Sequence, residues 1–217
     1  MIPALLTLAG LIVGMALVRA LRSHSYRNPD EKHLPRRRRR WLPAAVAVTW
    51  GLAGLAWWPT DPAYLVFVLA VSVPLLVLAA IDLDVQRLPD RWTLPLLAGT
   101  ALAVLPVTLM SESRAGLLEV LGCGLGMWVA YGVMLFLPGS GMGGGDVKLA
   151  PTIGFLAGTL TWPLAVLSGL ITFAVAGVVG LALMAAGRPR GTLMAFGPFM
   201  VLGALATTAL VPALSRL

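Results

Sequence analysis

Cysteine, histidine and charge are all scarce in this sequence. Only 12% of its 217 residues are charged, and it has one cysteine and two histidines. A single cysteine, Cys123, excludes a disulfide framework and a cysteine-based metal cluster, and we interpret it as a small packing residue. The histidines, His24 and His33, share one polar loop, and the zinc-binding pattern His-Glu-x-x-His does not occur. Ser140, in a glycine-rich stretch, has no histidine near it in sequence to act as its base.

What the sequence has in abundance is apolar residues. Hydrophobic residues make up 59% of the chain and its mean hydropathy is +0.89, a profile typical of a multi-pass membrane protein rather than a soluble domain. The net charge of +7 is concentrated in one loop that contains five consecutive arginines, 36–40. We interpret this loop as solvated and cytoplasmic, with lipid headgroups rather than nucleic acid as its partners.

Apolar segments of suitable length recur along the whole chain. A membrane span needs roughly 20 apolar residues, and we predict an all-α bundle of about eight spans within one integral membrane domain, residues 1–217, in which residues 21–40 form the basic loop. The predicted spans are residues 2–20, 41–58, 64–81, 94–109, 116–137, 147–160, 164–186 and 192–214. The sixth is short for a span. Pairs of small residues are predicted to mark close helix contacts: Gly10 with Gly14, Gly122 with Gly126, and Ala176 with Gly180.

The distribution of lysine and arginine predicts the orientation. No charged side chain precedes the first apolar segment, whereas Arg19 and Arg22 follow it, the reverse of a secretory signal. With the amino terminus outside, fourteen basic residues lie on the inner side and two on the outer side, as the positive-inside rule requires. This orientation places two aspartates, Asp82 and Asp146, on the same cytoplasmic side. We therefore expect them to face each other across the bundle.

Those aspartates belong to two unusual stretches. Asp146 follows the glycines of residues 141–145 and precedes an apolar segment, while Asp82 begins a run, residues 82–90, that holds three of the nine acids in the chain. An acid at the centre of a membrane helix costs roughly 2.5–3.5 kcal/mol, so such residues are functional candidates. Glycines allow close backbone approach, as a site for an extended peptide needs. The simpler alternative is a flexible connector in which Asp146 caps the next helix.

Together these stretches resemble the type IV prepilin peptidases, intramembrane aspartyl proteases of the GxGD type. The resemblance rests on three motifs in order and covers most of the chain from about residue 70. The motifs are Ile81-Asp82 with Leu88-Pro89-Asp90 and Thr93, then Gly141-Met142-Gly143-Gly144-Gly145-Asp146-Val147-Lys148-Leu149, and finally Phe196-Gly197-Pro198-Phe199. The resemblance implies that Asp82 and Asp146 are the catalytic pair. It marks the following as supporting motif residues: Gly143, Gly145, Pro89, Asp90 and Lys148.

The resemblance also implies a substrate and a location. The substrate would be a prepilin or pilin-like precursor with a short basic leader in the cytoplasm and an apolar helix in the bacterial cytoplasmic membrane, cleaved at the boundary between them. Longer family members carry two Cys-x-x-Cys pairs between their first spans, and many also methylate the new amino terminus. Residues 21–40 have no cysteine, and we do not predict methyltransferase activity from this sequence.

Two carboxyl groups suffice for this chemistry without a metal or cofactor. One activates water and the other donates a proton, and two close aspartates share one proton, so that their titrations belong to the pair. We interpret Asp84 as a solvated loop acid, Asp90 as a helix-start residue ahead of the fourth span and Lys148 as structural. Two other classes remain as alternatives: a transporter with intramembrane acids as ion sites, and a lipid-headgroup transferase with magnesium held by Asp82, Asp84 and Asp90.

Overall fold

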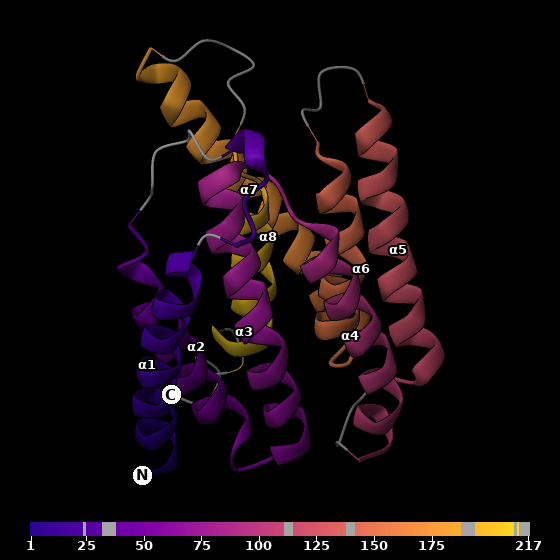
Figure 1. Ribbon diagram of the computed structural model, residues 1–217. Coiled ribbons are helices and arrows are strands. Elements are labelled where there is room, and N and C mark those ends of the chain that lie inside the picture. Colours follow the sequence, from indigo (N-terminus) through magenta and orange to yellow (C-terminus); the bar gives the residue numbers. More distant parts are fainter. Residues whose placement is uncertain are drawn as a thin grey trace.

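The computed structural model of the chain describes residues 1–23, 25–31, 38–110, 115–137, 142–187, 194–210 and 212. These residues form a bundle of helices, as predicted (Figure 1). The helices are α1 (Ile2–Ala20), α2 (Trp41–Trp57), α3 (Pro62–Val85), α4 (Asp90–Met110), α5 (Leu117–Phe136), α6 (Gly144–Gly158), α7 (Trp162–Ala185) and α8 (Gly197–Leu205). Two 3-10 turns, Leu21–Ser23 and Pro29–Glu31, follow α1, and a π-helical turn, Ala206–Leu210, extends α8.

Each predicted apolar segment contains a helix, but the helices differ in length. In the described part of the chain, five are long and apolar enough to cross a membrane: α1 with its 3-10 extension, α3, α4, α5 and α7. The other three are shorter, with 17 residues in α2, 15 in α6 and nine in α8. The structure therefore supports a multi-pass membrane protein with five candidate spans by length among the described residues, and the spans predicted at α2, α6 and α8 stay predictions.

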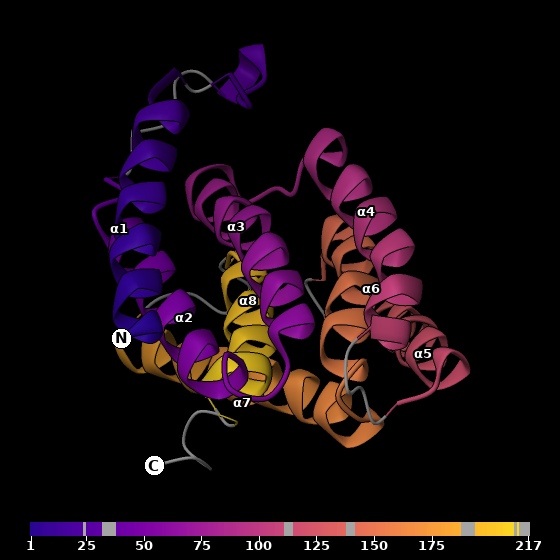
Figure 2. The same cartoon turned by 90° about the horizontal axis from the view of Figure 1, so that it is seen from below.

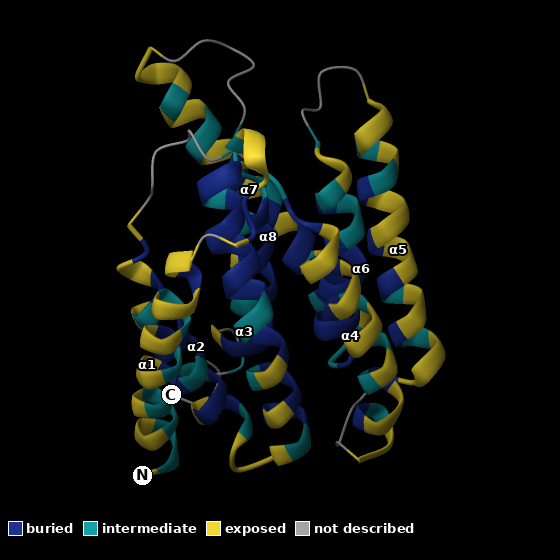
Figure 3. Cartoon of the chain, in the orientation of Figure 1, coloured by how far each residue is buried: buried dark blue, intermediate teal, exposed yellow. Residues whose placement is uncertain are grey.

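Helix α3 forms the centre of the bundle. Of its most apolar window, 72% is buried, against 17–28% for the other long helices. Seen along the helix axes, α1 and α2 lie on one side of α3 and α4 and α6 on the other (Figure 2), and the burial colouring is darkest there (Figure 3). Its apolar side chains explain this position, since Leu75, Leu78 and Ile81 are fully buried.

Small residues allow the closest helix contact in only one of the predicted pairs. Helix α1 packs on α2 at Gly10 and Gly14, where a Cβ atom on Gly10 would lie 2.9 Å from the carbonyl oxygen of Val46. The prediction is wrong for Gly122 and Gly126, because a Cβ on either glycine would meet nothing within 4 Å. On α5 the close contact is made instead by Gly124, against the ring of Phe155.

Candidate active site

Asp82 lies in the last turn of α3 and is buried, with 4% of its surface exposed. Its Oδ2 accepts a hydrogen bond of 2.8 Å from the backbone N–H of Gly197, the first residue of α8. A helix amino terminus carries unpaired N–H groups and a partial positive charge. The carboxyl group of Asp82 is therefore held at the amino-terminal end of α8, which joins two elements 115 residues apart.

Asp146 is the third residue of α6 and is also buried, with 7% exposed. Its Oδ2 accepts a 3.0 Å hydrogen bond from the N–H of Gly143, directly before the helix. This contact matches the simpler prediction, in which Asp146 caps the helix. It uses only one of the two carboxylate oxygens in the described structure, so capping leaves Asp146 able to contact a substrate as well.

The two aspartates come together at one end of the bundle, as predicted. The carboxyl end of α3 and the amino ends of α6 and α8 all lie toward the upper end of Figure 1, opposite the amino terminus. Both carboxyl groups are buried there, and Gly145, next to Asp146, packs against Leu88 in the turn that follows α3. The fold thus joins two acids that are 64 positions apart in the sequence.

Glycines make this close arrangement possible. A Cβ atom on Gly197 would lie 2.9 Å from Asp82 Oδ2, and one on Gly145 would lie 2.9 Å from Leu88 Cβ. Separations this short force something to move, so only glycine fits at either position without displacing its neighbour. Gly143 is similar, because its Cβ would lie 3.1 Å from Asp146 Oδ2. Gly141, the first glycine of the predicted motif, lies outside the described residues, as do Ser140, His24 and His33.

Comparison with known proteins places this arrangement in a family. The family model "Type IV leader peptidase family" matches residues 68–184, more than half of the chain, and this range includes both aspartates. The chain belongs to the type IV leader peptidase family.

Several curated relatives of this family member are named prepilin leader peptidase/N-methyltransferase. The chain is 35% identical to the protein of that name from Dichelobacter nodosus, over 65% of this chain and 48% of the relative. The Escherichia coli relative is 32% identical, over 65% of this chain and 59% of the relative, and that from Dickeya chrysanthemi is 38% identical, over 56% and 42%. The chain thus spans about half the length of the curated relatives it matches. No solved structure matches it significantly.

In this leader peptidase family member, the remaining motif residues shape the start of α4. The helix begins at Asp90, as predicted. The carbonyl oxygen of Pro89 accepts hydrogen bonds from the N–H of Trp92 (2.9 Å) and of Thr93 (3.1 Å). Lys148 Nζ lies 2.7 Å from Asp90 Oδ1, which joins α6 to α4. Lys148 therefore contributes to structure, in agreement with the interpretation from sequence.

Asp84 corrects one prediction. The sequence suggested a solvated loop acid, but α3 continues past the predicted end to Val85, and the side chain of Asp84 is fully buried. Its Oδ2 accepts hydrogen bonds from the hydroxyl of Tyr26 and from the guanidinium groups of Arg27 (2.8 Å) and Arg39 (3.1 Å). The predicted solvated state is also wrong for Arg39, which is 7% exposed. Burial raises the pKa of Tyr26 to about 12, which keeps its hydroxyl protonated and able to donate.

Sequence reasoning missed an aromatic cluster at the amino end of α8. The ring of Tyr131 on α5 lies 5.4 Å from that of Phe173 and 6.3 Å from that of Phe196. Its buried hydroxyl has no hydrogen-bond partner among the described residues. Phe196 directly precedes Gly197, so this cluster supports the amino end of α8. A tyrosine within an apolar span carries no signal in sequence that could have identified it.

Proposed function

We propose that this chain is a membrane-embedded aspartyl endopeptidase that removes the short basic leader from prepilin or pilin-like precursors. The observation that carries the proposal is the meeting of two buried carboxyl groups, Asp82 and Asp146, at one end of a helix bundle. Peptide hydrolysis requires a base and an acid in reach of one bond. The family and the names of the relatives favour this chemistry over other uses of paired acids.

In the proposed reaction, one carboxylate of the pair takes a proton from a water molecule as the water oxygen attacks the carbonyl carbon of the peptide bond. The protonated carboxyl group donates to the carbonyl oxygen. When the C–N bond breaks, the leaving nitrogen takes the proton that the first carboxylate gained from water and becomes the new amino terminus. One hydroxyl of the intermediate returns its proton to the second carboxylate as the new carboxyl end forms, which restores the pair. Either aspartate can take either part, because the two groups act as one coupled pair. The N–H groups of Gly143 and Gly197 fix the positions of the carboxyl oxygens.

The type of precursor that we propose follows from where the two aspartates lie. The aspartates lie at the end of the bundle that the charge distribution assigns to the cytoplasm, in a bacterial cytoplasmic membrane. A substrate with a basic leader in the cytoplasm and an apolar helix in the membrane would present its boundary at that depth. The proposal concerns leader cleavage and does not extend to methylation of the product.

The positions of the acids weaken both alternatives. An ion transporter would use acids near the middle of a span, whereas Asp82 is in the last turn of α3 and Asp146 in the first turn of α6. A magnesium site would need Asp82 and Asp84, at the end of α3, to converge with Asp90 at the start of α4. Instead, Asp84 is paired with two arginines and Asp90 with Lys148.

The test is cleavage of a prepilin co-expressed with this chain in a bacterial membrane, followed by gel shift and mass. We expect the wild type to remove the leader, and Asp82→Asn and Asp146→Asn each to slow cleavage at least about a hundredfold, the usual contribution of a positioned acid or base. Asp30→Asn is the matched control, because Asp30 is an exposed acid on the 3-10 turn Pro29–Glu31. It should cleave as the wild type does.

The outcomes separate the candidate functions. Cleavage by both asparagine variants at the wild-type rate, with equal amounts of inserted protein, contradicts the aspartyl mechanism. Loss of wild-type cleavage in EDTA would favour the metal-dependent alternative, since the proposed reaction needs no metal ion. A wild type that cuts none of several prepilins contradicts the proposed substrate class.

A further inference from the structure

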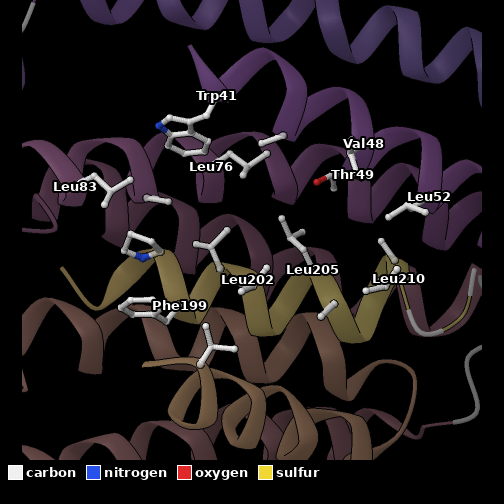
Figure 4. Close-up of a pocket in the computed structure, with 17 residues that line it drawn as sticks. Trp41, Val48, Thr49, Leu52, Leu76, Leu83, Phe199, Leu202, Leu205 and Leu210 are labelled. Atoms are coloured by element: carbon white, nitrogen blue, oxygen red, sulfur yellow. The ribbon is translucent and has the colours of Figure 1, made fainter. Parts of the chain in front are cut away.

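A long apolar groove runs along the outside of the bundle between α2 and α8. Its volume is about 610 Å³. In Figure 4, α2 forms one wall and α8 the other, with Trp41, Leu83 and Phe199 toward one end and Leu52 and Leu210 toward the other. We call it the lateral groove. From Trp41 to Leu52 it follows α2 for about 16 Å, at 1.5 Å per residue, or about three helical turns.

The lining suits an apolar helix. The α2 wall is a stripe at helical spacing, in which Thr49 is the only residue with a hydroxyl and Val48 is 57% exposed. Alanines lie on α2, on α3 and on the π-helical turn that extends α8: Ala45, Ala79, Ala206 and Ala209. Small residues of this kind allow the backbones of two membrane helices to approach closely. Laying a helix into an apolar groove is a common mode of peptide recognition.

The end of the groove adjoins the candidate active site. Leu83, which lines the groove, is the residue directly after Asp82, and Pro198 is the residue directly after Gly197. Asp82 accepts the N–H of Gly197, so the same contact that orients the carboxyl group also joins α3 to α8 where the groove ends. A chain that leaves a helix in the groove at this end would pass directly into reach of the carboxyl pair.

We propose that the lateral groove binds the apolar helix of the precursor, with the amino end of that helix beside Leu83 and Pro198. This inference rests on the proposed function and adds to it the surface that recognises the substrate. A precursor bound in this way would present the residues before its apolar helix to Asp82 and Asp146. The depth of the groove end would then select the peptide bond that is cut.

A second groove, between α5 and α7, makes a useful comparison. Its volume is about 510 Å³, and it is lined by small and apolar residues together with Glu119 and Cys123. Tyr131 and Phe173 belong to its lining, and their rings cluster with that of Phe196 at centroid distances of 5.4–6.3 Å. None of its lining residues is adjacent in sequence to Asp82, Asp146 or Gly197, whereas Leu83 and Pro198 of the lateral groove are. The second groove therefore provides matched controls.

The first experiment fills each groove in turn. Ala45→Trp in the lateral groove should lower kcat/KM for a full-length precursor at least about tenfold, because the large ring occupies the space of the helix. Ala130→Trp, the same change on the exposed wall of the second groove, should leave it unchanged. A short peptide with the leader and cleavage site but no apolar helix should be cut by Ala45→Trp as by wild type. Equal cleavage of the full-length precursor by both variants overturns the proposal, and slower cleavage of the short peptide also overturns it by indicating damage to the active site.

The second experiment measures binding without cleavage, so it separates a wrong groove from a wrong function. Asp82→Asn is combined with Cys123→Ala and Val48→Cys, and disulfide formation is measured with a precursor that carries one cysteine in its apolar helix. The proposal is supported if the cysteine at position 48 crosslinks to the precursor, while a protein that keeps Val48 and the native Cys123 does not. This result would support the groove even if the reaction is not leader cleavage. Crosslinking between two copies of this chain, or occupancy by lipid alone with no protein crosslink, overturns it.

Discussion

At the scale of single residues, the first residue of α8, Gly197, leaves the space that the carboxyl group of Asp82 occupies. In Gly197→Ala the new Cβ would lie 2.9 Å from Asp82 Oδ2 and 3.4 Å from its Cγ, so the carboxyl group must move. A displacement of about 1 Å at a reacting group can cost about a hundredfold in rate. We therefore expect leader cleavage to fall by about that factor in a membrane assay, while the amount of inserted protein stays constant.

The matched control is Gly144→Ala. Gly144 is the first residue of α6, as Gly197 is of α8, but a Cβ there would meet nothing within 4 Å. Alanine at an open helical position is neutral or slightly stabilising, so cleavage should continue at the wild-type rate. If Gly197→Ala also cleaves normally, the close packing of α8 against Asp82 is not required for activity. The sequence shows a glycine at both positions, but it does not indicate which of the two is needed for close packing, because that depends on what each glycine faces in the fold.

At the scale of elements, the segment after α1 is attached to the turn between α3 and α4. Arg87 binds Glu31 through two contacts, Nε to Oε1 at 2.8 Å and Nη2 to Oε2 at 3.0 Å. The hydrogen bonds from Arg87 lower the pKa of Glu31 below its ordinary value. A lowered pKa in the folded state stabilises the attachment above about pH 4.3, the ordinary value for glutamate. That contribution is lost as the pH falls through the lowered pKa.

Hydrogen exchange of residues 25–31 measures this dependence. We expect their protection to fall a few-fold when the pH is lowered from 7 to below the pKa of Glu31, since a partly exposed ion pair contributes about 1 kcal/mol or less. Glu31→Gln should show the lower protection already at pH 7 and lose this step in its pH profile. If Glu31→Gln shows the same pH-dependent step in protection as the wild type, the step arises from the titration of another group. Arginines in a loop suggested solvation from sequence, but Arg27 and Arg39 pair with Asp84, which lies too far along the chain for a local pattern to indicate the pairs.

At the scale of the whole molecule, hydropathy predicted where the helices lie along the chain. It did not predict features that depend on specific side-chain contacts, such as the end of α3. The eight apolar segments each contain a helix, because a helix satisfies the hydrogen bonds of every backbone N–H and C=O group within the segment, as a membrane interior without water requires. Hydropathy predicted that α3 ends at Ile81, but the helix continues to Val85. Hydropathy does not take account of ion pairs, and Asp84 is buried in this last turn because it pairs with Arg27 and Arg39. The distribution of lysine and arginine placed both aspartates on one side of the membrane, and from this we predicted that they meet. The lateral groove was not predictable, because it depends on how α2 and α8 are placed around α3.

Orientation is the remaining prediction of the molecule as a whole, and α2 offers a test at its two ends. Arg40 precedes the helix and Thr60 follows it, and both residues are exposed. With 17 residues, α2 is about 25 Å long. Arg40 lies at the same end of the bundle as Asp82, because the neighbouring Arg39 binds Asp84, two residues after Asp82. In a Cys123→Ala background, an impermeant maleimide added to intact cells should label Thr60→Cys and should label Arg40→Cys only after permeabilisation. Labelling in the opposite sense would put the aspartates outside the cell, where a cytoplasmic leader cannot reach them, and labelling of both from outside would mean that α2 does not cross the membrane.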